Sequence, residues 1–158
     1  MKKINYPKLL FSIAIAEGVG LLSALLSRGQ REFYSSLVRP PLSPPGWLFP
    51  IVWVLLYAMM GAAFYFVKTS ARGSYSDHKS AVIYYILQLA VNFSWSIVFF
   101  RFEALLAAAV VIILLDLLVI ITMMQFRLIN KLAFWLMIPY LVWILFATYL
   151  NIGIVLLN

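Results

Sequence analysis

Five long runs of apolar residues account for most of the chain, and short polar segments separate them. Each run meets or approaches the roughly 20 residues with which an α-helix crosses the hydrocarbon core of a bilayer. The runs lack the alternation of apolar and polar residues that is typical of transmembrane β-barrels. We therefore predict five transmembrane helices, at residues 9–26, 47–67, 80–100, 104–126 and 132–157. They form one all-α integral membrane domain, residues 1–158, a five-helix bundle with a long loop between the first and second helices.

The composition agrees with a membrane protein and excludes several kinds of site. Hydrophobic residues make up 65% of the chain and charged residues 11%, against about 45–50% and 25% in soluble domains. The absence of cysteine excludes disulfides, thiolate metal sites and cysteine nucleophiles. The single histidine, His78, falls in a polar loop, so a site of several histidines for zinc or haem is also excluded. The sequence predicts no metal site and no cofactor, and it contains no catalytic triad or phosphate-binding loop.

The net charge is +7. The positions of the basic residues indicate how the chain is oriented in the membrane, because basic residues between membrane spans favour the cytoplasmic side. Eight basic residues fall on one side of the predicted spans: Lys2, Lys3, Lys8, Lys68, Arg72, Lys79, Arg127 and Lys131. Four fall on the other: Arg28, Arg31, Arg39 and Arg101. This count predicts a cytoplasmic N-terminus and a long first loop on the outer side. It does not indicate a nucleic-acid partner.

The stretch 39–53 holds five of the seven prolines and two of the five tryptophans. Proline fixes φ, removes a backbone donor and pushes the preceding residue towards extended geometry. Residues 39–46, which we call the proline strap, are therefore expected to be stiff and extended rather than helical. The strap delivers Trp47 and Trp53 to the start of the second predicted helix, and we expect it to act as a lid or pocket wall.

Three predicted helices each carry a stripe of aromatic residues with polar or small residues among them. Such spacings of three, four, seven or eight residues place side chains on one face of a helix. The stripes are Trp53, Tyr57, Gly61 and Phe64; Gln88, Asn92, Trp95 and Phe99; and Tyr140, Trp143, Ala147, Leu150 and Asn151. Two interpretations stay open. The stripes line one cavity for a flat apolar ligand, or they form the core of the bundle with hydrogen bonds between helices.

Glu17 and Asp116 are the carboxylic acids within the predicted spans, and no basic residue lies inside a span to pair with them. An ionisable side chain within a membrane indicates a functional site by default. The alternative is a neutral hydrogen bond between helices. Because the two residues lie on different helices, the sequence alone does not make them a catalytic pair.

These motifs resemble, in order and spacing, the TspO family of tryptophan-rich sensory proteins, which are related to the mitochondrial translocator protein or peripheral benzodiazepine receptor. The second span matches through Arg39-Pro40-Pro41, Pro44-Pro45-Gly46-Trp47, Pro50, Trp53, Leu56-Tyr57 and Met60-Gly61. The third matches through Gln88-Leu89, Asn92, Trp95 and Phe99-Phe100, and the fifth through Pro139-Tyr140, Trp143, Phe146-Ala147 and Leu150-Asn151. The first span contributes only Gly18 and Gly20. The resemblance therefore covers nearly the whole chain.

The resemblance implies a homodimer in a bacterial cytoplasmic membrane, with a pocket beneath the long first loop. It implies porphyrin ligands such as protoporphyrin IX, other tetrapyrroles, and synthetic isoquinoline and benzodiazepine compounds. Carried over position by position, the ligand contacts are Trp47, Trp53, Gln88, Asn92, Trp95, Tyr140, Trp143, Ala147 and Leu150. Tyr57 joins them from its place on the second-helix stripe.

Two departures from the family pattern limit what is carried over. The cholesterol motif of animal members has a Tyr followed by an Arg, but residues 150–155 here contain neither, and no basic residue follows them. Cholesterol recognition through that motif is therefore not predicted. The family's acid on the fourth helix aligns with Val111, five residues before Asp116, so no role is transferred to Asp116.

We expect a receptor or sensor that binds, sequesters or moves porphyrin, and a binding protein rather than an enzyme. The macrocycle would stack on Trp53, Trp95 and Trp143, with Gln88 and Asn92 at its polar edge. The loop 27–45 would close over it, and Arg28, Arg31 or Arg39 would meet the propionates. The alternative is an enzyme that degrades protoporphyrin in light, with Trp53 and Trp143 as oxidisable side chains. A transporter is a third hypothesis, although the sequence lacks the paired broken helices of many transporters.

Overall fold

The computed structural model describes residues 4–27 and 30–158, with the side chains of residues 30 and 31 left out of the account. The described chain is helical and contains no strand. The five long helices are α1 (Tyr6–Leu26), α3 (Leu48–Thr69), α4 (Tyr75–Ser96), α5 (Leu105–Ile129) and α6 (Lys131–Leu157). A π-helical turn, η1 (Ile97–Arg101), continues α4. The predicted all-α bundle is confirmed, because five described helices are long and apolar enough to cross a membrane.

Several helices begin or end outside the predicted apolar runs, because polar residues cap them. Asn5 accepts a hydrogen bond from the Lys8 backbone at the start of α1, three residues before the predicted boundary. Ser74 and Asp77 form a capping box at the start of α4. Asn130 ends α5 and caps α6 through the backbone amides of residues 132 and 133. An apolar run therefore marks the lipid-crossing part of a helix, and its polar neighbours set the ends.

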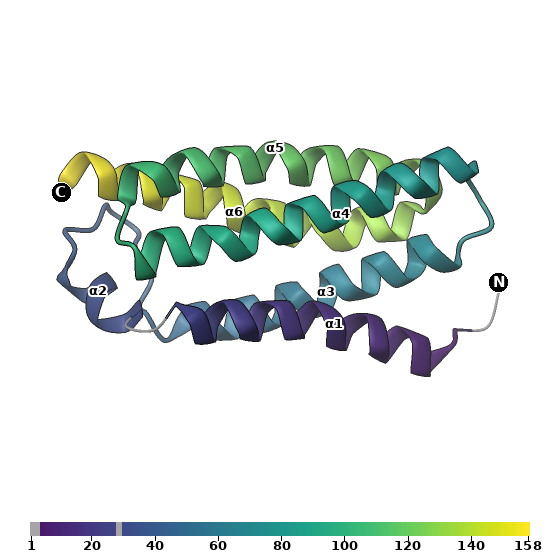
Figure 1. The fold of residues 1–158 in the computed structure, drawn as a ribbon, viewed down its shortest axis with the longest axis horizontal. Helices are drawn as coiled ribbons and strands as arrows, with labels where there is room; N and C mark the ends of the chain where they lie inside the picture. The colour runs from purple at the N-terminus through teal and green to yellow at the C-terminus, as the bar shows by residue number, and fades with distance from the viewer. Residues whose placement is uncertain (1–3, 28–29) are drawn as a thin grey trace.

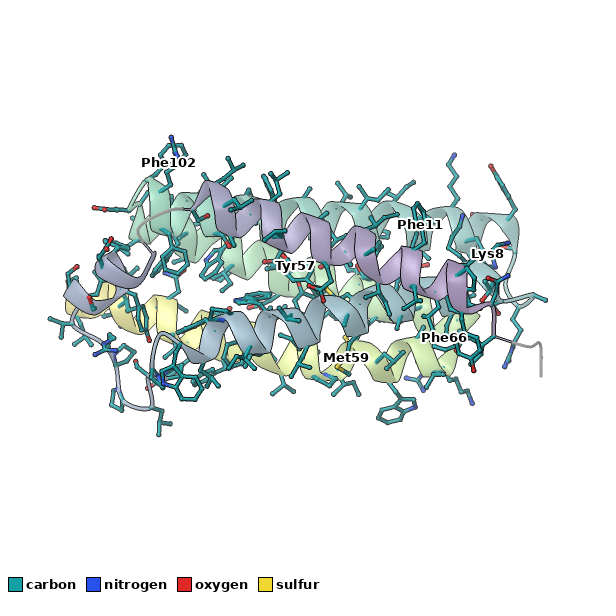
Figure 2. All side chains as sticks on the ribbon, turned by 90° about the horizontal axis from the view of Figure 1, so that it is seen from below. Lys8, Phe11, Tyr57, Met59, Phe66 and Phe102 are labelled. Carbon is teal, nitrogen blue, oxygen red and sulfur yellow. The ribbon has the colours of Figure 1, made fainter. Side chains whose placement is uncertain are left out.

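The long helices run side by side along the length of the molecule (Figure 1). α1 packs mainly against α3, whereas α5 packs against both α4 and α6, and α3 packs against α6. The bundle thus consists of an α1–α3 pair resting on an α4–α5–α6 group. Lys8 and Phe66 lie near one end of the bundle, and Phe102 lies at the other (Figure 2).

A close contact between backbones fixes the α1–α3 pair. The Ser12 hydroxyl donates to the Gly61 carbonyl over 2.7 Å. A Cβ at Gly61 would lie 2.6 Å from the Ile13 Cα, so glycine is needed for this approach. Small residues that let membrane helices meet closely are a common basis of their packing.

The loop between α1 and α3 contains a short helix, α2 (Gln30–Ser36), where the sequence indicated only a loop. Its aromatic residues Phe33 and Tyr34 pack against a core cluster that includes Trp95 and Phe99. Isolated helices of this length are marginal, so tertiary packing stabilises α2, and the local sequence does not reveal it.

The proline strap and Val38, which precedes it, follow α2 and lie against the C-terminal end of α6, with three contacts. Tyr149 donates to the Pro41 carbonyl over 3.0 Å. Asn158 pairs with both backbone groups of Val38, at 2.9 and 3.0 Å. A Cβ at Gly153 would lie 2.7 Å from the Pro40 ring, so the strap rests directly on a glycine. The strap is non-helical, as its prolines predict.

Candidate ligand cavity

A cavity of about 580 Å³ lies between α1, α3, α4 and α6, below α2 and the end of the strap. Its volume falls within the roughly 300–1,000 Å³ of small-molecule sites. Its lining residues are Ala14, Glu17, Gly18, Gly20, Leu21, Ser23, Ala24, Tyr34, Gly46, Phe49, Pro50, Trp53, Val54, Tyr57, Asn92, Trp95, Ser96, Phe100, Trp143 and Ala147. The lining is mostly apolar and aromatic, with a few polar groups, as small-molecule sites usually are.

Three tryptophans from three different helices line this cavity. Trp53 comes from α3, Trp95 from α4 and Trp143 from α6. Trp53 lies 5.7 Å from the Tyr57 ring between centroids, and Trp143 lies 5.8 Å from Phe49. These tilted and edge-to-face contacts hold the aromatic walls in place while leaving ring surface on the cavity side.

The indole groups differ in their hydrogen bonding. Trp95 donates from Nε1 to the Asn151 side-chain oxygen over 3.1 Å, and Asn151 donates in turn to the Leu105 carbonyl over 3.2 Å. This chain joins α4, α6 and α5 and fixes the orientation of the Trp95 ring. The Nε1 atom of Trp143 is buried and has no hydrogen-bond partner among the described residues. The Trp143 ring therefore lines the cavity, whereas its Nε1 donor is enclosed in the packing around the ring.

A buried polar network connects α4 to α6 beside the cavity. The Tyr140 hydroxyl donates to the Gln88 side-chain oxygen over 2.9 Å and accepts from the Asn92 amide over 3.0 Å. Gln88 and Tyr140 are both fully buried. Asn92 alone of the three lines the cavity. The interhelical hydrogen bonds considered from sequence therefore exist, and one member of the network also faces the cavity.

We call the part of the cavity lining formed by Tyr34 of α2 and Phe49 at the start of α3 the roof. Tyr34 packs edge-to-face on Phe49 at 5.2 Å between ring centroids, and its hydroxyl donates to the Pro44 carbonyl over 3.3 Å. The guanidinium of Arg39 lies 5.2 Å from the centroid of the Tyr34 ring. Arg39 therefore places a positive charge beside Tyr34, although Arg39 is exposed and is not itself a lining residue. Arg28 lies outside the described residues, and the side chain of Arg31 is not described.

One whole wall of the cavity comes from α1, which sequence reasoning did not assign to a site. Its lining residues are small or polar, and only Leu21 is large. Gly20 lets the Tyr57 ring approach, since a Cβ there would lie 2.5 Å from a ring carbon. Figure 2 shows Tyr57 between α1 and α3. The signal in the sequence was Gly18 and Gly20 together with Glu17, but no aromatic stripe marked this helix.

The ten residues predicted as ligand contacts divide into two groups. Six line the cavity: Trp53, Tyr57, Asn92, Trp95, Trp143 and Ala147. Four are not among the lining residues: Trp47, Gln88, Tyr140 and Leu150. Trp47 precedes α3 and is 60% exposed, whereas the other three are buried in the bundle. Helical spacing predicts which face of a helix a residue lies on. It does not predict whether the side chain borders the cavity, and this difference separates the two groups.

Asp116 lies apart from the cavity lining and contacts α6. Its Oδ2 accepts a hydrogen bond from Thr148 over 2.8 Å. Its Oδ1 is buried without a hydrogen-bond partner among the described residues. The described residues also contain no group of three His, Cys, Asp or Glu side chains that could hold a metal ion.

The family model described as TspO/MBR family matches residues 12–157. The chain is 40% identical over 127 residues to Tryptophan-rich protein TspO of Chlorobaculum tepidum, covering 80% of this chain and 79% of that protein. It is 36% identical over 156 residues to Tryptophan-rich protein TspO of Archaeoglobus fulgidus, covering 98% and 99%. The Translocator protein of Bos taurus is 32% identical over 133 residues, covering 84% and 79%. The resemblance read from the tryptophan and proline motifs is thereby confirmed, and the chain belongs to the TspO/MBR family.

Proposed function

We propose that this membrane protein is a receptor for porphyrins, protoporphyrin IX and related tetrapyrroles, which bind in the cavity beneath α2 and the strap. The observation that carries the proposal is the convergence of Trp53, Trp95 and Trp143 on one cavity of about 580 Å³. Flat aromatic ligands gain both burial and ring contacts from such walls. The names of the relatives, a tryptophan-rich sensory protein of Cereibacter sphaeroides and a translocator protein of Bos taurus, agree with a sensing or translocating role.

Two polar features support a preferred orientation of the porphyrin. Arg39 at the roof offers a cation for a propionate, and charge-assisted bonds of this kind are the stronger ones. Asn92 supplies a further polar group, already held by Tyr140. The propionates would therefore point towards the roof, with the macrocycle below it.

The test is porphyrin binding by the purified protein in nanodiscs, followed by tryptophan quenching and by the shift of the porphyrin absorption band. Trp53→Ala and Trp143→Ala should each weaken protoporphyrin binding by about tenfold or more, because each removes a ring wall. Trp135→Ala is the matched control, since Trp135 is 63% exposed and lies outside the cavity lining. Unchanged affinity in both cavity variants would sink the proposal.

A second candidate is the light-dependent degradation of protoporphyrin, favoured by the presence of Trp53 and Trp143 in the same cavity. The test is product formation by the purified protein under light, compared with Trp53→Phe and Trp143→Phe. These variants keep an aromatic ring but remove the readily oxidised indole. If free porphyrin bleaches equally fast without protein, the enzyme hypothesis fails.

The remaining expectations are proposals with their own measurements. Porphyrin uptake into proteoliposomes would support transport. Isoquinoline and benzodiazepine compounds should compete with porphyrin for the cavity. Light scattering in detergent tests the homodimer. Labelling of residues placed at either end of the bundle tests the cytoplasmic N-terminus in a bacterial membrane, which rests on the distribution of basic residues.

A further inference from the structure

Glu17 places a single carboxyl group in the wall of the cavity. It lies on α1 nine residues before the helix ends at Leu26, which corresponds to about 13 Å along the axis from the loop end. Tyr57 and Asn92 line the same cavity. Glu17 is the one carboxylic acid among the described lining residues, and none of them is Lys, Arg or His.

A carboxyl group inside a membrane-spanning helix needs hydrogen-bonding or charged groups around it. Ionisable side chains within a membrane are costly and usually face another charged group, a backbone group or a water-filled cavity. The described lining offers Glu17 no cation. The Ala58 backbone on α3 lies within hydrogen-bonding reach of the Glu17 carboxyl group, whose two oxygens have room for further bonds. A ligand that carries an ammonium, an amidinium or an aromatic N–H group would supply a second partner, because a carboxyl oxygen accepts hydrogen bonds from all three.

Inside the cavity, Glu17 is surrounded mainly by apolar and aromatic walls. Arg39, a cation at the loop end, lies over the Tyr34 ring and is exposed outside the lining. A ligand that matches this lining is flat and aromatic, with a basic or N–H group at the level of Glu17.

We propose that Glu17 is a specificity-determining residue that binds the basic nitrogen or N–H group of a flat aromatic ligand. The inference rests on the proposed use of this cavity as the ligand site. In a free-base porphyrin the corresponding donors are the pyrrolic N–H groups. The cavity then distinguishes nitrogen-bearing aromatic ligands from hydrocarbons of the same shape, which the tryptophan walls alone would not do.

The experiment compares two tricyclic probes of similar shape with the full chain in nanodiscs. 9-Aminoacridine is cationic at neutral pH and carries N–H donors, whereas anthracene has neither. Glu17→Gln should weaken the binding of 9-aminoacridine by about tenfold or more, through loss of a charge-assisted hydrogen bond, and leave anthracene unchanged. Glu32→Gln, in the first turn of α2 and outside the lining, is the matched control and should change neither affinity. Empty nanodiscs correct for partition into lipid.

Glu17→Asp separates loss of the acid from damage to the helix. It keeps the carboxyl group on a shorter side chain, so it should retain more affinity for 9-aminoacridine than Glu17→Gln. Equal affinity of the wild type and Glu17→Gln for 9-aminoacridine overturns the inference. So does an equal loss for both probes, or a wild type that binds neither. Protoporphyrin is titrated in parallel: if it fails to bind while 9-aminoacridine depends on Glu17, the porphyrin proposal falls and this inference stands.

Discussion

The Tyr57 ring occupies the space into which a side chain at Gly20 would project. A Cβ at Gly20 would lie 2.5 Å from the Tyr57 Cε2 atom, closer than real contacts allow. Both residues line the cavity. The glycine on α1 and the tyrosine on α3 therefore determine together how closely these helices approach and how much space remains beside them.

Gly20→Ala should move the Tyr57 ring or push α1 away from α3, and either change alters the cavity. Gly18→Ala is the matched control, because a Cβ at Gly18 would meet nothing within 4 Å. Both substitutions carry the same gain in helix propensity, so their difference reports the steric clash. We expect the free energy of unfolding of Gly20→Ala to lie about 1–2 kcal/mol below that of Gly18→Ala. Equal stability of the two variants would contradict this role for Gly20.

Tyr140→Phe should destabilise the bundle more than it weakens ligand binding. It removes the hydroxyl that joins Gln88 to Asn92 and leaves the buried Gln88 oxygen without this donor. The expected loss is about 1–2 kcal/mol in free energy of unfolding. Chemical unfolding in mild detergent measures it, with Tyr75→Phe as the control, since Tyr75 is 85% exposed. A large loss of porphyrin affinity with unchanged stability would instead make Tyr140 a ligand contact.

Thr148→Val should destabilise the α5–α6 contact, because it removes the donor to Asp116 Oδ2 while Oδ1 is already without a partner in the described structure. A buried acceptor that loses its donor costs about 1–3 kcal/mol. The double variant Asp116→Leu with Thr148→Val removes both polar groups and should recover much of that loss. The unfolding free energies of the wild type, Thr148→Val, Asp116→Leu and the double variant form a cycle. If the double variant loses as much as the sum of both single variants, the two side chains are not coupled.

Gly153→Ala should lift the proline strap from α6, because the new methyl group would meet the Pro40 ring at 2.7 Å. Hydrogen exchange at the Val38 backbone amide, which donates to the Asn158 side chain, should become faster, and the cavity should lose affinity for porphyrin. Ile152→Ala, at an exposed neighbouring position on α6, is the control. Exchange that stays at the wild-type rate in Gly153→Ala would show that the strap does not depend on this contact.

The helical spacing of aromatic residues in the sequence predicted the tryptophans that line the cavity. Trp53, Trp95 and Trp143 sit on helical stripes, and the three helices turn those stripes towards one cavity. The same periodicity did not separate Gln88 and Tyr140 from the lining residues. Both residues lie on the predicted helix face, but they are buried in the packed interior of the bundle. Which residues of a stripe border the cavity depends on how the helices pack in three dimensions.

The α1 wall was missed for a different physical reason. A wall made by small residues has no large side chains to mark it, so Gly18 and Gly20 show in the sequence as packing glycines only. α2 was missed because its stability comes from Tyr34 and its neighbours packing on distant residues. The strap is non-helical as predicted, since its prolines restrict the backbone locally. The expectation that it is extended throughout was wrong at Leu42, where the chain turns with a φ of 66°.

The exposed lining residues of α1 have a consequence for protein engineering. On the α4 and α6 walls, Asn92 and Trp95 hold hydrogen bonds on which the core depends. On α1, by contrast, Ala14, Gly18 and Leu21 line the cavity and are exposed. New side chains at those three positions would change the shape of the cavity while disturbing few existing contacts. A library restricted to this face of α1 is therefore the shortest route to a version of the bundle that prefers a different ligand.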